Sequence, residues 1–263
     1  MKSAAAAGTT RVPWQETMPA VLYFDLESTG VDFAEDIDIT CAATLLVEDN
    51  GDRRLLTWHS DFAPKMSGAD LERLGGYIAD VCRRATLVTF NGLGYDLRVL
   101  ATAIQRAHAA SALPRDLAAL AHSDRHVDVF YQWLCEKGYY AGLSSFLSAN
   151  ELLQKSMSGE DAITQWADGP LLAKQAVLEY VSGDVECLRQ LYELVVDAKG
   201  CFRVAKRTGK KTHWKVPSWQ STLESTGVYN RKKPDVAWLE DPPEVHNVRR
   251  WIAEYGVREA DPC

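Results

Sequence analysis

The segment from Ala20 to Gly30 constrains the fold of this 263-residue chain more than any other. It begins with an apolar run rich in β-formers and ends in Ser, Thr and Gly, a pattern typical of a buried strand that closes in a turn. Two acids, Asp25 and Glu27, interrupt the end of this run. Because side chains alternate along a strand, both carboxylates project from one face, where burial is costly and like charges repel. The pattern predicts a compensating hard divalent cation beside the pair.

Beyond this segment, β-type and helical patterns alternate along the chain. Runs of β-formers bounded by turn signals predict strands at 20–27, 38–48, 53–59, 86–90 and 125–130. Apolar residues at helical spacing predict helices at 69–84, 97–110, 130–137, 143–153, 161–166 and 171–199. This order indicates an α/β fold with a mixed five-stranded sheet flanked by helices. The end of the chain adds a β-hairpin over 201–216 and a mixed segment over 219–263 with two short helices.

Composition narrows the class of protein. With 46% hydrophobic and 25% charged residues, the chain has the make-up of an ordinary soluble globular protein. No apolar run reaches the roughly 20 residues that span a bilayer, so no membrane partner is expected. Residues 1–19 hold an Ala run but no long apolar stretch, which predicts a mobile tail and no secretory signal. The six cysteines stand singly, so we expect buried reduced thiols in a cytoplasmic protein and no thiolate zinc site.

The charge of the chain is unevenly distributed. Its net charge is −7, which by itself argues against a nucleic-acid partner. Between Lys199 and Lys233, however, ten Lys and Arg residues accompany a single acid, Glu224. That segment carries +9 and leaves −16 for the remainder. A cationic patch beside an acidic body suits a polyanionic substrate together with metal-binding carboxylates.

Two further acids stand at positions where apolar or neutral residues would be ordinary. Asp96 lies at the junction of a predicted strand and a predicted helix, where helix capping is the structural alternative to a site role. Tyr180 and Asp184 are four residues apart in the long predicted helix and share one face. Gly183 is unfavourable in mid-helix, and we interpret it as permitting close packing against a neighbouring strand. The structural alternative for this pair is a hydrogen-bonded tyrosine at the edge of the core.

Taken together, the three motifs resemble those of the DEDD superfamily of 3′–5′ exonucleases, which have a ribonuclease H-like fold. Phe24–Gly30 is similar to the first motif, Asn91–Asp96 to the second and Tyr180–Asp184 to the third. In the histidine subtype a histidine would stand five residues before the last aspartate, and that position is Glu179. The resemblance is therefore to the tyrosine subtype, DEDDy.

Within that superfamily the chain is similar to stand-alone relatives of the family-B DNA polymerase proofreading domain. The stretch Gly142–Tyr192 carries this likeness, and motif similarity spans about 20–200. The basic hairpin and the stretch Pro234–Trp238 resemble C-terminal extensions of such relatives. We therefore expect a tail at 1–19, an exonuclease domain at 20–200, and an extension with the basic hairpin at 201–263.

The resemblance implies an active site that uses two divalent ions to hydrolyse phosphodiester bonds from a 3′ end and release nucleoside 5′-monophosphates. Asp25, Glu27, Asp96 and Asp184 would hold two Mg²⁺ or Mn²⁺ ions, which carboxylates prefer over zinc. Tyr180 would orient the attacking water, since its reference pKa near 10 makes it a poor base at neutral pH. Asn91 is expected to hydrogen-bond the terminal nucleotide or to position the loop before Asp96.

Predicted contacts to nucleic acid come from a loop lysine and from the hairpin. Lys155 is expected either to contact a phosphate or to lie on the solvated surface. The hairpin interleaves aromatic residues with cations, a combination that grips single strands. Its predicted contacts are Lys206, Arg207, Lys210, Lys211 and Trp214. The alternative is a solvated ribbon whose aromatic residues pack on the core. Asp128, a further acid, is assigned either a role behind the metal ligands or a structural hydrogen bond.

Two other functions compete with this interpretation. Asp25–Thr29 approaches the Asp-x-Asp-x-Thr motif of haloacid-dehalogenase phosphatases, but Glu27 stands at the third position and Leu188 where a later Asp is needed. A nucleic-acid-binding module with an inactive nuclease site is disfavoured, because all four acids and the tyrosine are present. For the substrate, the polymerase resemblance favours single-stranded DNA, and an exoribonuclease is the alternative.

Overall fold

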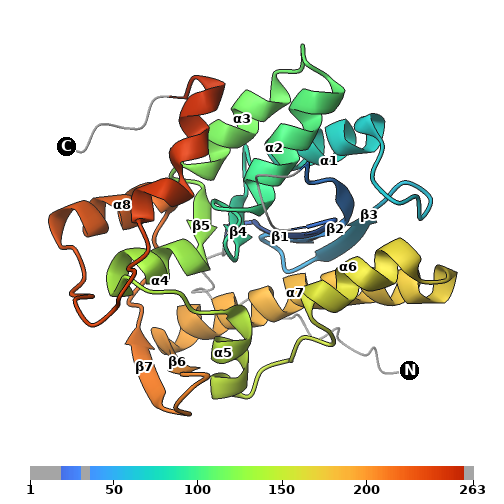
Figure 1. Cartoon of the computed structure of the whole chain (residues 1–263). Helices are drawn as coiled ribbons and strands as arrows, with labels where there is room; N and C mark the ends of the chain where they lie inside the picture. The colour runs from blue at the N-terminus through green and yellow to red at the C-terminus, as the bar shows by residue number, and fades with distance from the viewer. Residues whose placement is uncertain (1–18, 31–35, 258–263) are drawn as a thin grey trace, which may run out of the picture.

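A computed structural model describes residues 19–30 and 36–257 of the chain, so residues 1–18 of the expected tail lie outside the described residues. A five-stranded sheet forms its centre, in the order β3-β2-β1-β4-β5 (Figure 1). β1 pairs antiparallel with β2, and β2 with β3, whereas β1–β4 and β4–β5 are parallel. The expected mixed five-stranded sheet is confirmed. Its strands are β1 (Val21–Ser28), β2 (Ile39–Val47), β3 (Arg53–Trp58), β4 (Thr86–Thr89) and β5 (His126–Asp128).

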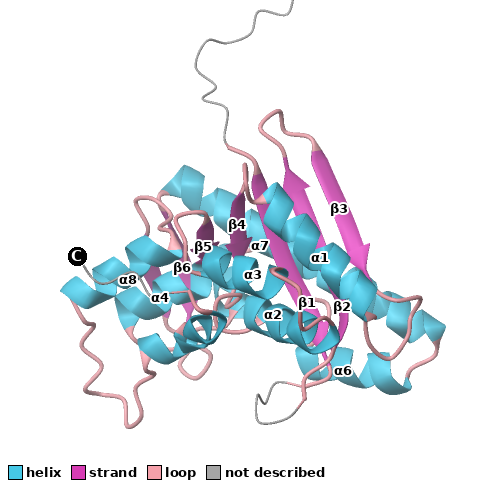
Figure 2. Cartoon of the chain, turned by 90° about the horizontal axis from the view of Figure 1, so that it is seen from above, coloured by secondary structure: helices cyan, strands magenta, loops and turns pink. Residues whose placement is uncertain are grey.

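Helices cover both faces of the sheet. Helices α1 to α3 pack on one face and α5 to α7 on the other, as Figures 1 and 2 show from two directions. The alternation of β1 divides its side chains between these layers: Phe24 joins the core under α1 and α2, and Tyr23 joins the core under α7. Asp25 has the same parity as Tyr23, so the acids of β1 face the α7 layer. The helices are α1 (Gly68–Val81), α2 (Asp96–Ala107), α3 (Leu113–Ala121), α4 (Val129–Lys137), α5 (Leu143–Leu147), α6 (Gly159–Asp168), α7 (Leu171–Ala198) and α8 (Thr222–Arg231).

The structure corrects the sequence predictions in three places. Helix α3 was not predicted; it begins with Pro114 in its first turn, where a missing N–H costs nothing. The strand predicted at 125–130 has only three residues, because α4 starts at Val129 with Asp128 as its N-cap. The helix predicted at 143–153 ends early: α5 is followed by one 3₁₀ turn, η1 (Ser148–Asn150), and by Glu151 in the left-handed region.

The C-terminal residues contribute side chains to the hydrophobic cores on both faces of the sheet. The hairpin β6 (Gly200–Val204) and β7 (Lys211–Lys215) forms a second sheet, and its Trp214 belongs to the core under α7. Two 3₁₀ segments, η2 (Val245–Val248) and η3 (Arg250–Tyr255), pack on the opposite side, where Trp251 is buried. In the part of the chain that the structure describes, no helix is both long and apolar enough to cross a membrane.

Candidate metal centre

Three carboxylates from β1 and α7 meet at the carboxyl end of β1. Asp25 and Glu27 come from the strand and Asp184 from the middle of the helix that packs over it. One oxygen of each carboxylate lies within 4.8 Å of one oxygen of each of the others. The strand parity that predicted a shared face for Asp25 and Glu27 is confirmed, and the packing of α7 adds Asp184.

Burial and mutual repulsion make these charges costly. The pKa of Asp25 is raised well above its usual value, first by burial and then by the charges of Asp96 and Asp184. Burial, followed by Asp184, raises the pKa of Glu27 to about 8. The pKa of Asp184 is also raised, again chiefly by burial. A group of carboxylates held this closely needs a cation in order to be ionised near neutral pH.

Lys155 supplies part of that positive charge. Its Nζ lies 2.6 Å from Asp184 Oδ2 and 5.1 Å from the centre of the Tyr180 ring. The ammonium lowers the pKa of Asp184 and of the neighbouring Asp25 and Glu27, although burial outweighs this effect. The carboxylate of Asp184 is 3% exposed, and hydrogen bonding from Lys155 and from Tyr180 also lowers its pKa. Lys155 therefore lies beside the carboxylates and not on the solvated surface. In this structure it contacts the carboxylate of Asp184, and its contact with a phosphate stays a prediction.

Asp96 approaches the same strand from another direction. Its Oδ1 accepts a hydrogen bond of 3.3 Å from the backbone N–H of Leu26, between the two acids of β1. Burial raises the pKa of Asp96 to about 7. The capping alternative is wrong, because Tyr95 is the N-cap of α2 and Asp96 is its first helical residue. Asp96 is thus a neighbour of the three-carboxylate group but lies outside its 4.8 Å limit.

The loop before α2 is shaped by glycine and by Asp128. Asn91 has a φ of 70°, and a Cβ on Gly92 would lie 2.5 Å from the Thr89 side chain, so the turn requires glycine there. Asp128 accepts hydrogen bonds from the backbone N–H groups of Asn91, Leu93 and Tyr131, at 3.0, 2.8 and 2.9 Å. Of the two roles expected for Asp128, the structure shows the structural hydrogen bonds, which connect the loop to α4.

The C-terminal segment holds this loop from the other side. Trp251 Nε1 donates a 2.8 Å hydrogen bond to the carbonyl oxygen of Leu93. Tyr95 OH lies 2.7 Å from Ser28 Oγ and donates to the carbonyl oxygen of Gly30, which fastens the loop to the end of β1. Sequence reasoning missed Trp251 and Tyr95 as supports of the second motif, since neither has a local pattern that reveals its partner.

Tyr180 lies one turn before Asp184 on α7, as the spacing predicts. It is only 1% exposed, and burial, with the Asp184 charge second, raises the pKa of its hydroxyl above the ordinary value. The hydroxyl therefore stays protonated at neutral pH and is suited to donating a hydrogen bond. The packing role assigned to Gly183 is wrong: apart from its chain neighbours and the backbone of its own helix, no atom of the described residues lies within 4 Å of where its Cβ would be.

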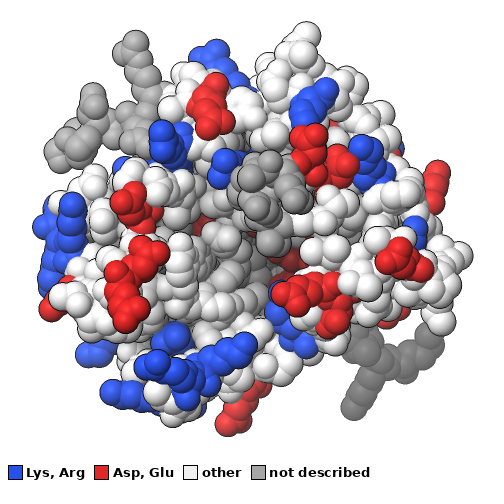
Figure 3. All heavy atoms as spheres, viewed as in Figure 1, with Lys and Arg blue, Asp and Glu red and all other residues white. Residues whose placement is uncertain are grey.

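A pocket of about 280 Å³ opens beside the carboxylates. Its lining combines charged side chains with apolar ones. It is lined by Asp25, Phe90, Gly142, Leu143, Ser144, Lys155, Asp184 and Leu188. The space-filling view in Figure 3 shows a molecular face that is hollowed in its middle.

The residues present fit a hard divalent ion. The donor set is all oxygen, and one oxygen from each of its three carboxylates converges with the others within 4.8 Å. The described cysteines are free and buried, and none belongs to this group of potential ligands. The arrangement suits Mg²⁺ or Mn²⁺ better than a thiolate-bound metal.

The predicted contacts on the hairpin divide into two sets. Lys206, Arg207, Lys210 and Lys211 are exposed. Trp214 is 0% exposed: its ring packs against those of Trp133 and Phe146, and its Nε1 donates a 2.8 Å hydrogen bond to Glu136. The prediction that Trp214 contacts nucleic acid is therefore wrong, because the side chain is part of the core.

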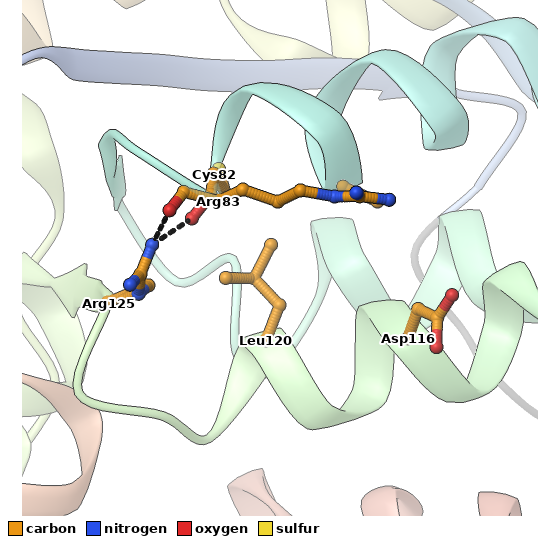
Figure 4. A pocket seen from close by; sticks show the side chains of 6 residues that line it. Cys82, Arg83, Asp116, Leu120 and Arg125 are labelled. Carbon is orange, nitrogen blue, oxygen red and sulfur yellow. Dashed lines mark hydrogen bonds between the residues drawn. The ribbon is translucent and has the colours of Figure 1, made fainter.

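Another pocket, of about 490 Å³, lies between α1 and α3, away from the carboxylates (Figure 4). The Arg125 guanidinium at its rim donates to the carbonyl oxygens of Cys82 and Arg83. This arginine closes the end of α1, where carbonyl groups lack helical partners. We therefore assign Arg125 a structural role in holding the end of α1.

Comparison with known proteins assigns the family. Residues 22–196 match the family model of the RNase_H superfamily, and the chain belongs to that superfamily. No curated protein matches the chain.

The fold is also similar to several solved structures. One is the family B DNA polymerase of the hyperthermophilic archaeon Pyrobaculum calidifontis, with 16% identity and a TM-score of 0.48 over 68% of this chain and 25% of that one. Two are of exonuclease I, each 12% identical. One has a TM-score of 0.36 over 69% of this chain and 44% of that chain. The other, E. coli exonuclease I in complex with an oligonucleotide, has a TM-score of 0.37 over 68% and 41%. The chain thus spans less than half the length of each.

Proposed function

We propose that this chain is a metal-dependent nuclease that removes nucleotides from the 3′ end of a nucleic acid, of the DEDDy type. The observation that carries the proposal is the convergence of Asp25, Glu27 and Asp184 within 4.8 Å at the end of β1, in a chain of the RNase H superfamily. Asp96 beside them and Tyr180 one turn before Asp184 complete the motif pattern.

Asp25, Glu27 and Asp184 would hold the divalent ions, with Asp96 joining through a small movement of its side chain. When bound, a pair of such ions supplies an activated water and stabilises the charge on the leaving 3′ oxygen. By the motif resemblance Asp25 would serve both ions, and the charges of Asp96, Asp184 and Glu27 around it help to raise its pKa. β1 and α7 are regular elements, which position side chains more precisely than loops do.

Tyr180 and Lys155 would act on the scissile phosphate. The protonated hydroxyl of Tyr180 donates a hydrogen bond that orients the attacking water, since its raised pKa opposes proton abstraction. Lys155, which pairs with Asp184, would turn to the phosphate once metal neutralises that carboxylate. Asn91 holds the loop before Asp96 in its left-handed turn, and its side chain would contact the terminal nucleotide.

The substrate we favour is single-stranded DNA, and the products are nucleoside 5′-monophosphates. The motif resemblance to polymerase proofreading domains supports this choice. An exoribonuclease and a binding module with an inactive site are the competing outcomes of the test.

The test incubates 5′-labelled single- and double-stranded DNA and RNA with Mg²⁺, with Mn²⁺ or with EDTA. We expect a descending ladder from single-stranded DNA with either metal and intact substrate in EDTA. A ladder from RNA alone would make the chain an exoribonuclease, and binding without shortening would reduce it to a binding module. Tyr180→Phe should slow the ladder while leaving its metal requirement unchanged, which tests the tyrosine subtype.

A further inference from the structure

The β6–β7 hairpin has one face in the core and one in solvent. Cross-strand pairing places Phe202 opposite His213, with Lys211 and Lys215 on the same side of the ribbon by strand parity. These side chains are exposed, while Cys201 and Trp214 of the opposite parity are buried. The aromatic residue that the hairpin offers to solvent is therefore Phe202, whose exposure is 41%.

The outer face and the turn of the hairpin carry unpaired positive charge. No acid occurs between residues 200 and 223. Five exposed cations lie on β7 or in the turn, and no ion pair with a described residue involves any of them. They are Lys206, Arg207, Lys210, Lys211 and Lys215. Figure 3 shows Lys and Arg side chains gathered at the lower left, over β6 and β7.

Phe202 is fixed within this cationic surface. Lys211 Nζ lies 4.7 Å from the centre of its ring, and the His213 ring lies 4.9 Å away. The side chain of Asn150 holds the backbone of Phe202 at both ends, accepting from its N–H at 2.9 Å and donating to its carbonyl oxygen at 2.7 Å. An exposed, positioned aromatic ring bordered by cations is the arrangement that grips single strands by stacking and phosphate contacts.

The same anchor connects the hairpin to the carboxylates. Asn150 and Lys155 are five residues apart, so the chain between them spans at most about 18 Å. Helix α5 lies between the two regions: Leu143 lines the carboxylate pocket, and Phe146 packs against Trp214 under the hairpin. A nucleic-acid strand whose 3′ end reaches Lys155 would therefore pass Phe202 only a few nucleotides from that end.

We propose that the outer face of the β6–β7 hairpin binds the single-stranded part of the substrate upstream of the cut, with one base stacked on Phe202 and phosphates on the surrounding lysines and Arg207. This inference rests on the proposed nuclease function. In this proposal Phe202, and not the buried Trp214, is the aromatic residue that contacts nucleic acid.

The experiment measures binding of a labelled single strand of about 16 nucleotides by fluorescence anisotropy in EDTA, so that no cleavage occurs. Phe202→Ala should weaken binding about tenfold, as loss of one base–aromatic stack does, and Phe202→Trp should restore it. Lys206→Ala with Lys210→Ala should reduce the slope of log K against log salt by about 1.4, since each phosphate contact contributes about 0.7. Melting temperatures verify that each variant is folded.

The matched control is Arg73→Ala with Arg83→Ala, which removes two exposed cations from α1 and the turn after it, on the other face of the sheet, and should leave binding unchanged. Equal weakening in this control, or unchanged binding in both Phe202→Ala and the hairpin lysine pair, would overturn the inference. Cleavage of a dinucleotide by the unaltered chain with Mg²⁺ or Mn²⁺ tests the metal centre without the hairpin. Failure there counts against the proposed function, whereas failure in the binding series counts against the hairpin alone.

Discussion

The carboxylates of β1 and α7 and the cations of the β6–β7 hairpin both border α5, and the two regions hold their charge in opposite ways. Asp25, Glu27 and Asp184 are brought together in a poorly solvated site, so their pKa values rise and a cation is needed. The hairpin cations project into water, where screening allows like charges to remain close. The first region is built to bind an ion in a fixed geometry. The second is suited to a long, flexible polyanion.

The largest expected effect isolates the carboxylate region. Asp25→Asn keeps the shape of the side chain but removes an anionic ligand, so cleavage should fall about a thousandfold. Asn is neutral in the folded and the unfolded state, so it avoids the cost of burying a carboxyl group that is ionised when unfolded, and the metal-free protein at pH 8 should melt about 2 °C higher than the unaltered chain. The two measurements are a cleavage rate with Mg²⁺ and a thermal melt in EDTA. Unchanged cleavage would refute the role of Asp25.

The second prediction separates the two faces of the hairpin. Trp214→Ala opens a cavity beside Trp133 and removes one of the hydrogen bonds to Glu136, so it should destabilise the fold by about 3 kcal/mol. Phe202→Ala, on the exposed face of the same ribbon, is the matched control and should leave unfolding unchanged. Urea titration of both variants measures the difference. Similar costs for the two residues would contradict the assignment of the inner and outer faces.

The third prediction concerns the lysine that joins the regions. Lys155→Met removes the ammonium that pairs with buried Asp184, so the metal-free protein should lose about 2 kcal/mol of stability near neutral pH. A saturating divalent ion should recover much of that loss, because it neutralises the same carboxylate. Melting curves in EDTA and in Mg²⁺ test both statements. A similar loss in both buffers would assign Lys155 to packing alone.

The last prediction is a dependence of stability on pH. Glu27 and Asp96 have pKa values raised to about 8 and about 7, above their unfolded values near 4. The folded state therefore favours their protonated forms. The stability they contribute is fully present below the unfolded pKa and is lost as the pH rises through the folded pKa. In EDTA the melting temperature should fall by several degrees or more between pH 5 and pH 8, and by less in Mg²⁺.

A matched variant sharpens this last measurement. Glu27→Gln removes the group with the higher of these two pKa values, so the fall between pH 5 and pH 8 should become shallower. A melting temperature that rises over the same range in the unaltered, metal-free chain would contradict the direction of these shifts.

Local periodicity predicted much of the fold. The five strands, the long helix and the hairpin were found because alternation and helical spacing are properties of neighbouring residues. Helix α3 was missed, because a short helix with a proline in its first turn, after a short alanine-rich linker, has little pattern of its own. The early end of α5 depends on Asn150, whose side chain bonds to β6, more than 50 residues away.

In the candidate site, too, some features follow from neighbouring residues and others from contacts between distant ones. From the sequence alone it followed that Asp25 and Glu27 share a face of β1 and that Tyr180 and Asp184 share a face of α7, since both pairs obey the period of their element. Only the tertiary structure decided that Lys155 pairs with Asp184, that Asp128 holds the loop before Asp96, and that Trp214 points inward. Periodicity fixes which side chains point together, but not which face meets the core. That choice is made by packing and by hydrogen bonds between segments that are distant in sequence.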